Sequence, residues 1–173
     1  MDTNLLLILI LIGIIGAIIM IKGVFKSDAT ITATPAASNE LFVAIVDRSI
    51  EGDYTNSTIT KLRISVFEYC TSLTSIDLPN VTSIGNYTFY SCTSLTSIDL
   101  PNVTSIGDSA FSGCTSLTSI DLPKVTSIGN YAFSSCSKLT AIHFSASNKS
   151  KIEANSYYSE KWRATNATIY FDL

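Results

Sequence analysis

A 22-residue repeat constrains this chain more than any other feature. The strings CTSLTSIDLPNVTSIGNYTFYS (70–91), CTSLTSIDLPNVTSIGDSAFSG (92–113) and CTSLTSIDLPKVTSIGNYAFSS (114–135) follow one another directly, and CSKLTAIHF continues the pattern from Cys136. A strict period of this length is typical of a solenoid, in which each unit buries its apolar face only by stacking on its neighbours. The sequence therefore predicts a solenoid over residues 70–144.

Six positions remain apolar in every copy, so they must point into the stack. Stacked strands lie about 4.8 Å apart, so identical side chains form columns along the solenoid axis. The predicted core consists of these columns. Their members are Leu73, Ile76, Leu78, Val81, Ile84 and Phe89, then Leu95, Ile98, Leu100, Val103, Ile106 and Phe111, then Leu117, Ile120, Leu122, Val125, Ile128 and Phe133.

Each coil is expected to contain two short extended segments. Ile76, Asp77 and Leu78 alternate between apolar and polar residues, which predicts a strand with the aspartate pointing outward. Pro79 then ends this strand, because proline cannot donate to a hydrogen-bond ladder. Residues 81–84 predict a second extended segment on the opposite wall.

A glycine follows this second segment in each coil. Gly85 precedes Asn86, and the equivalent pairs recur in the next two coils. This pattern predicts a glycine turn and a helix-capping residue, followed by one or two helical turns that place Phe89 in the core.

Four cysteines recur at the repeat spacing, at Cys70, Cys92, Cys114 and Cys136. Zinc sites use much shorter spacings, so no metal site is predicted. Side chains in one column also hold their Cβ atoms slightly too far apart for disulfides. We therefore predict a column of buried thiols that act as small apolar residues.

The pattern L-x-x-L-x-L at Leu73, Ile76 and Leu78 resembles the leucine-rich repeats. More narrowly, the string LTSIDLPNVTSIGNYAF-xx-C resembles the BspA-like class of bacterial and protozoan surface proteins, over roughly residues 41–173. Val81 and its equivalents occupy the position where many leucine-rich repeats carry a buried Asn or Cys, which fits the BspA-like class better than a ribonuclease-inhibitor-like horseshoe. The resemblance implies a mostly β solenoid with short helical turns on its convex side, a strand face that contacts partners, and a role in adhesion.

The rest of the chain is organised around this array. Residues 1–26 predict a membrane anchor, 27–39 a linker rich in Ala, Thr and Ser, and 40–69 an N-terminal cap with a degenerate repeat. Residues 145–173 predict a C-terminal cap made of a helix and a closing strand, in which Tyr157, Tyr158 and Trp162 seal the core.

An unbroken apolar run extends from Leu5 to Ile21, and with residues 23–25 it reaches the length needed to cross a bilayer. The N-terminus carries Asp2 and lacks the positive region of a secretory signal, so we expect a retained anchor, with cleavage near Ala36 as the alternative. The anchor residues are Leu5, Leu9, Ile14, Ile18 and Ile21.

Two opposing arguments concern the orientation of this anchor in the membrane. Lys22 and Lys26 follow the span, and the positive-inside tendency would place the repeats in the cytoplasm. The resemblance to surface proteins argues for the outside, and we expect the repeats there. Asn-x-Ser/Thr triplets support this location weakly; they begin at Asn56, Asn80, Asn86, Asn102, Asn148 and Asn166.

An outward column of carboxylates is the candidate partner-binding site. Aspartates about 5 Å apart repel one another, so the column should attract a basic partner or cations. A merely solvated face and a calcium site are the alternatives. The predicted binding residues are Asp77, Asp99 and Asp121, with Thr74, Thr96 and Thr118 and with Ser75, Ser97 and Ser119 beside them.

Catalysis finds no support in the sequence. His143 is the single histidine, no nucleophile can be assigned to it, and no glycine loop for a phosphate is present. We therefore predict no enzyme activity and no cofactor or metal. With 11 Lys and Arg residues, a net charge of −3 and a pI near 5.0, no nucleic-acid partner is expected.

Two functions follow as hypotheses. The first is a membrane-anchored surface module that binds a protein or glycan partner in adhesion. The alternative is a structural subunit of a filament, pilus-like appendage or virion, in which copies of the chain associate through the apolar helix. A third reading makes the repeats a spacer between other parts of an envelope protein.

Overall fold

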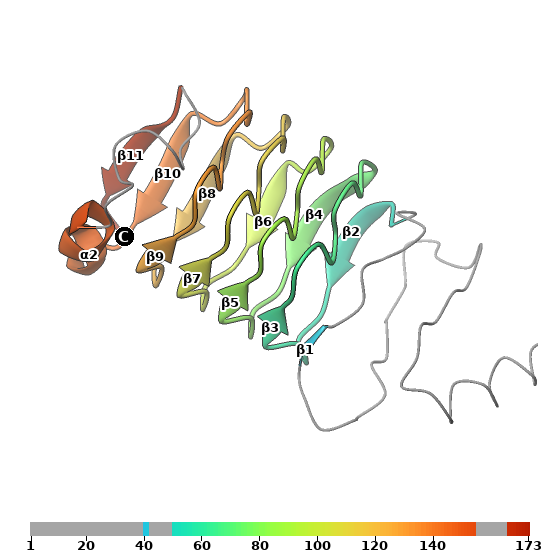
Figure 1. The fold of residues 1–173 in the computed structure, drawn as a ribbon, viewed down its shortest axis with the longest axis horizontal. Helices are drawn as coiled ribbons and strands as arrows, with labels where there is room; N and C mark the ends of the chain where they lie inside the picture. Colours follow the sequence, from blue (N-terminus) through green and yellow to red (C-terminus); the bar gives the residue numbers. More distant parts are fainter. Residues whose placement is uncertain (1–39, 42–49, 155–165) are drawn as a thin grey trace, which may run out of the picture.

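Parallel strands wind into a solenoid in the computed structural model, which describes residues 40–41, 50–154 and 166–173 (Figure 1). One row of strands, made of two three-stranded pieces of sheet, forms what we call the strand face, and Figure 1 shows its members side by side in chain order. They are β2 (Gly52–Thr55), β4 (Leu73–Asp77), β6 (Ser97–Asp99), β8 (Ser119–Leu122), β10 (Ala141–Phe144) and β11 (Thr168–Phe171).

A second sheet contains the shorter strands. Its order is β1-β3-β5-β7-β9, one strand from each coil. This sheet confirms the predicted second extended segment of each repeat. The strands are β1 (Glu40–Leu41), β3 (Lys61–Leu62), β5 (Ser83–Ile84), β7 (Ser105–Ile106) and β9 (Ser127–Ile128).

The strand pairing keeps the repeat in register. Ile76 pairs with Ile98, and Ser83 pairs with Ser105, each 22 residues further along the chain. The first coil departs from this rule at Gly52, which pairs with Leu73, 21 residues away, and from Asp53 onward the spacing is again 22. The structure therefore confirms that matching side chains recur at the same place on successive coils.

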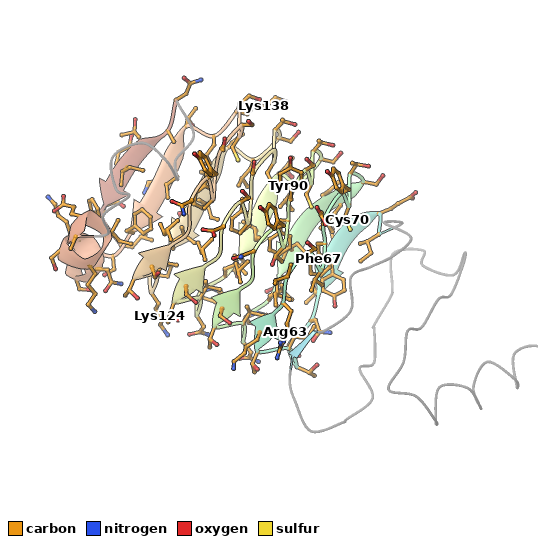
Figure 2. All side chains as sticks on the ribbon, in the orientation of Figure 1. Arg63, Phe67, Cys70, Tyr90, Lys124 and Lys138 are labelled. Carbon is orange, nitrogen blue, oxygen red and sulfur yellow. The ribbon has the colours of Figure 1, made fainter. Side chains whose placement is uncertain are left out.

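The core columns lie where the sequence predicts them. All of the listed apolar positions are buried except Ile98, which is partly buried against the core. The phenylalanines stack in one column, with ring centroids of Phe67 and Phe89 5.2 Å apart and those of Phe111 and Phe133 also 5.2 Å apart. Figure 2 shows Phe67 inside the coil, among the side chains that fill it.

The predicted helical turns are wrong. The segments that return from the second sheet to the strand face, such as residues 86–91, are non-helical turns. The N–H groups of Tyr87 and Phe89 donate to carbonyls of the next coil, at 2.9 and 2.7 Å, so they are not available for a helix. Tyr87 and Ser91 also have left-handed φ values of 56°. We call these the return segments (residues 64–70, 86–92, 108–114 and 130–136).

The glycine and asparagine at the start of each return segment act between coils. Asn86 Oδ1 accepts a hydrogen bond from the backbone N–H of Asp108 at 2.9 Å, and Asp108 Oδ1 accepts one from Asn130 at 2.7 Å. Gly107 allows this close stacking, because an added Cβ would lie 2.6 Å from the backbone nitrogen of Asn86. The pair therefore joins coils where the sequence predicted a helix cap.

The C-terminal end contains the predicted helix and strand. A 3₁₀ turn, η1 (Ala146–Asn148), leads into α2 (Lys149–Ala154), and β11 pairs with β10. Asn148 donates from Nδ2 to the carbonyl of Pro123 at 3.2 Å, as Asn102 does to Pro79 two coils earlier at 2.6 Å. The aromatic residues predicted to seal the core, Tyr157, Tyr158 and Trp162, lie outside the described residues.

The predicted membrane anchor, with Leu5, Leu9, Ile14, Ile18 and Ile21, also lies outside the described residues. Within the ranges that the structure does describe, none of the helices has the length and apolar character needed to span a membrane.

The cysteines form the predicted column of buried thiols, without disulfide bonds. Cys92 Sγ donates to the carbonyl of Phe67 at 3.0 Å, and Cys136 Sγ donates to that of Phe111 at the same distance. Burial raises the pKa values of Cys92 and Cys114, and it raises the pKa of Cys136 to about 12. These thiols therefore stay protonated at neutral pH.

Removing one phenylalanine ring from the column should strongly destabilise the fold. We expect Phe111→Ala to lower the free energy of unfolding by about 3–5 kcal/mol, because it leaves a cavity in a fully buried stack. Denaturant unfolding monitored by circular dichroism measures this change, with Ser112→Ala on the same segment as the control. A loss below about 1 kcal/mol would show that the ring is not part of a packed interior.

The buried thiols should be unreactive in the folded protein. At pH 8 we expect the four cysteines to react with a disulfide reagent only at the rate of unfolding, since the attacking species is the thiolate. All four should react at once in denaturant. Rapid labelling of Cys92, Cys114 or Cys136 under native conditions, located by mass spectrometry, would contradict the buried column.

Candidate partner-binding face

The predicted aspartates form one outward column on the strand face. Asp77 and Asp99 pair in register between β4 and β6, and Asp121 occupies the same position in β8. Asp77 is half-buried, whereas Asp99 and Asp121 are exposed. Among the residues that the structure describes, none of these three carboxylates forms an ion pair. The column therefore presents uncompensated negative charge.

The predicted hydroxyl groups lie beside this column, and several already have acceptors. Thr96 Oγ1 donates to the carbonyl of Thr74 at 3.0 Å, and Thr140 Oγ1 donates to that of Thr118 at 3.2 Å. Ser75 and Ser97 pair in register, and Ser119 occupies the next coil. The threonine column thus joins coils as well as lining the face, and the serines are the hydroxyls nearest in sequence to the carboxylates.

Asp53 adds a fourth carboxylate that the sequence analysis missed. Its Oδ1 accepts hydrogen bonds from Ser75 Oγ at 2.6 Å and from Thr74 Oγ1 at 3.0 Å. These bonds, that from Ser75 foremost, lower the pKa of the Asp53 carboxyl. Asp53 pairs with Ser75, 22 residues further along the chain, and so occupies the column that later coils fill with serine. Residues 53–55 match none of the residues 75–77 with which they pair, so the repeated letters carried no signal for this carboxylate.

The column of carboxylates ends at His143, which pairs in register with Asp121. His143 Nδ1 lies 2.9 Å from Asp172 Oδ1, and the imidazole stacks on Tyr170 with centroids 4.7 Å apart. Both partners come from the C-terminal strand or the residue after it. His143 therefore joins the last repeat coil to the closing strand.

The carboxylates on the strand face lie in a line along the solenoid axis. Neighbouring carboxylates at strand spacing, about 4.8 Å, repel by roughly 0.9 kcal/mol in water, and a positive partner relieves this repulsion. Basic side chains lie elsewhere in Figure 2, with Arg63 and Lys124 along the lower edge and Lys138 at the upper edge. In the described ranges, His, Cys, Asp and Glu do not gather in groups of three or more that could hold a metal ion.

The asparagine side chains of most Asn-x-Ser/Thr triplets form hydrogen bonds within the solenoid. Nδ2, the atom that a glycan would modify, donates from Asn80 to the carbonyl of Ser57 at 2.6 Å, and the Nδ2 atoms of Asn102 and Asn148 donate in the same way. Asn56 is buried, with Nδ2 3.4 Å from the Tyr54 hydroxyl. These asparagines have structural partners, so their triplets are weak evidence for glycosylation.

The return segments carry a group of tyrosines that the sequence analysis also missed. The Tyr90 ring packs edge to face with Tyr69 at 5.4 Å and with Tyr87 at 5.8 Å. Tyr69 and Tyr87 adopt left-handed φ values of 59° and 56°, a conformation that costs an L-residue about 1–2 kcal/mol. We call these three residues the tyrosine cluster.

Comparison with known proteins identifies the repeat family of this chain. The family model for the BspA type leucine-rich repeat region matches residues 54–169 in six copies. This chain belongs to the BspA-type leucine-rich repeat family. No curated protein sequence matches it.

Solved structures with a similar fold come from bacterial leucine-rich repeat proteins. A leucine-rich cell surface protein from Faecalibacterium prausnitzii is 26% identical with a TM-score of 0.53, and the match covers 70% of this chain and 35% of that protein. A leucine-rich repeat protein from Bacteroides ovatus is 24% identical with a TM-score of 0.42, covering 72% and 43%. The T. pallidum leucine-rich repeat protein is 22% identical with a TM-score of 0.42, covering 65% and 66%.

Proposed function

We propose that this BspA-type chain is a membrane-anchored surface module that binds a positively charged protein partner through its strand face and so takes part in adhesion. The observation that carries the proposal is the column of Asp77, Asp99 and Asp121, which is in register and without ion pairs among the described residues. Leucine-rich repeat proteins generally bind protein ligands, and the F. prausnitzii relative is named as a cell surface protein.

The shape of the face supports a broad contact. The carboxylates point out from strands that are fixed by the core columns behind them, so the face is rigid before a partner arrives. A preorganised charged surface raises the association rate and selects partners of opposite charge more than it raises affinity itself. A basic protein surface therefore fits this face better than a neutral one.

Neutralising the column should weaken binding without unfolding the chain. We expect Asp77→Asn, Asp99→Asn and Asp121→Asn together to reduce the association rate for a captured protein partner at least tenfold at low salt, and to flatten its salt dependence. Surface plasmon resonance across a salt series measures both effects.

Asp108→Asn is the matched control for this variant. It removes one carboxylate from a return segment, where Asn86 and Asn130 already occupy the same column. We expect it to bind as the unmodified chain does. Equal binding by the triple variant and this control would refute the strand-face site.

The anchor and its orientation form part of the same proposal, supported by the apolar run from Leu5 to Ile21. We expect the full chain to fractionate with membranes and a chain lacking residues 1–26 to be soluble. Protease added to intact cells should digest the repeats of the anchored form. Repeats that survive this treatment, but not detergent lysis, would place them inside the cell.

The filament alternative predicts a different particle size for the full chain. Light scattering of the full chain extracted in mild detergent should show one discrete species for an anchored binding module. A long polymer would instead favour a structural subunit.

A further inference from the structure

The near-identical coils differ from one another mainly on their return segments. Residues 70–85 and 92–107 are the same sixteen letters, whereas the following six residues read NYTFYS in one coil and DSAFSG in the next. Tyr87 and Tyr90 are therefore among the residues that make one coil unlike its neighbour. At the same column positions the next coil has Ser109 and Ser112.

These tyrosines lie on the far side of the core from the acidic column. Phe89 points inward from the return segment and Ile76 points inward from β4, and both are fully or almost fully buried. The tyrosines on the return segments point the other way: Tyr87 is 42% exposed and Tyr69 is 39% exposed. The tyrosine cluster thus forms a surface of its own, distinct from the strand face.

The backbone at these positions does not favour tyrosine. Gly113, with φ 78°, occupies the column of Tyr69, and glycine is the residue that this left-handed conformation suits. Tyr69 and Tyr87 nevertheless adopt this left-handed conformation. Since Tyr90 packs edge to face with both neighbours, the rings are also fixed relative to one another before any ligand arrives.

The surroundings of the cluster lack basic residues and are rich in hydroxyl groups. Within the return segments 64–70, 86–92 and 108–114, the charged residues are Glu68 and Asp108, and Ser65, Ser91 and Ser112 supply hydroxyl groups. These segments therefore carry no cation that would attract an acidic partner. They offer ring faces, phenol and serine hydroxyls, and carboxylates that can accept from a hydroxyl group.

We infer that the tyrosine cluster is a second binding site, and that its ligand is a neutral glycan. The C–H faces of a sugar ring stack on aromatic side chains, and sugar hydroxyls exchange hydrogen bonds with phenol, serine and carboxylate groups. Tyrosine supplies such contacts at low conformational cost because it has few rotatable bonds. The aromatic, hydroxyl-bearing surface matches this chemistry, and its lack of basic residues disfavours sialylated or sulfated forms.

The test compares the full chain with variants that copy residues from other coils. The double variant Tyr87→Ser and Tyr90→Ser reproduces Ser109 and Ser112, and Tyr69→Ser reproduces Ser91, so each replacement occupies a backbone position that serine already holds. Tyr131→Ser, which removes an exposed tyrosine from the column of Tyr87 two coils away, is the matched control. Circular dichroism melting verifies that each variant is folded.

The probe is a printed array of neutral hexose and N-acetylhexosamine oligosaccharides, with sialylated and sulfated forms of the same chains. We expect binding to neutral members, at least a tenfold loss for Tyr87→Ser/Tyr90→Ser, a loss for Tyr69→Ser, and no change for Tyr131→Ser. The triple Asp→Asn variant of the strand face should bind these glycans normally, which separates this site from the proposed protein-binding face.

Several results would overturn the inference. They are an absence of binding to every neutral glycan, equal binding by the double variant, or a preference for the charged forms. Capture of a protein partner that the double variant loses, with no glycan bound, would assign the cluster to protein recognition instead. If the double variant fails to fold, Tyr69→Ser and the single Tyr87→Ser decide the question on the same array.

Discussion

Hydrogen bonding between equivalent residues of successive coils is the constraint on which the rest of this structure depends. Strand residues pair 22 positions apart, and side chains repeat the same rule. Thr96 donates to the carbonyl of Thr74, and Asn102 donates to that of Pro79. Each coil therefore supplies hydrogen-bond partners for the polar groups of its neighbour, and a single coil alone would leave such groups unpaired.

The stacking of equivalent residues on successive coils limits which side chains can occupy a column. Phenylalanines can be stacked in the interior, with ring planes 1° to 13° apart, because apolar rings gain contact at that spacing. Carboxylates repel at the same spacing, so the outward Asp77, Asp99 and Asp121 are placed where water screens them. The Asn86, Asp108 and Asn130 column is compatible with partial burial because each of the first two accepts a backbone N–H from the next.

The ends of the array need residues that the repeat does not contain. Asp53 accepts the hydroxyl hydrogens of Thr74 and Ser75 at the first coil. His143 joins the last repeat coil to the closing strand through Asp172, and Asn148 donates its amide to the carbonyl of Pro123 in the preceding coil. The two chemically different surfaces, an acidic strand face and a return side with a tyrosine cluster, then arise on opposite sides of one core. They can bind different partners because the core separates them.

The sequence by itself determined the columns. A period of 22 placed Phe111 inside, Asp99 outside and Cys114 in a thiol column, because a residue that recurs in every coil has the same neighbours in every coil. Only the tertiary structure decided the features that depend on the next coil. The return segments form turns where a helix was predicted because their N–H groups bond across coils, and Asp53 joins the strand face by pairing with Ser75 although its segment does not match the repeated letters. Contact between Tyr69 and Tyr90 likewise joins residues from two coils at positions that the repeat does not share, so only the folded chain brings these rings together.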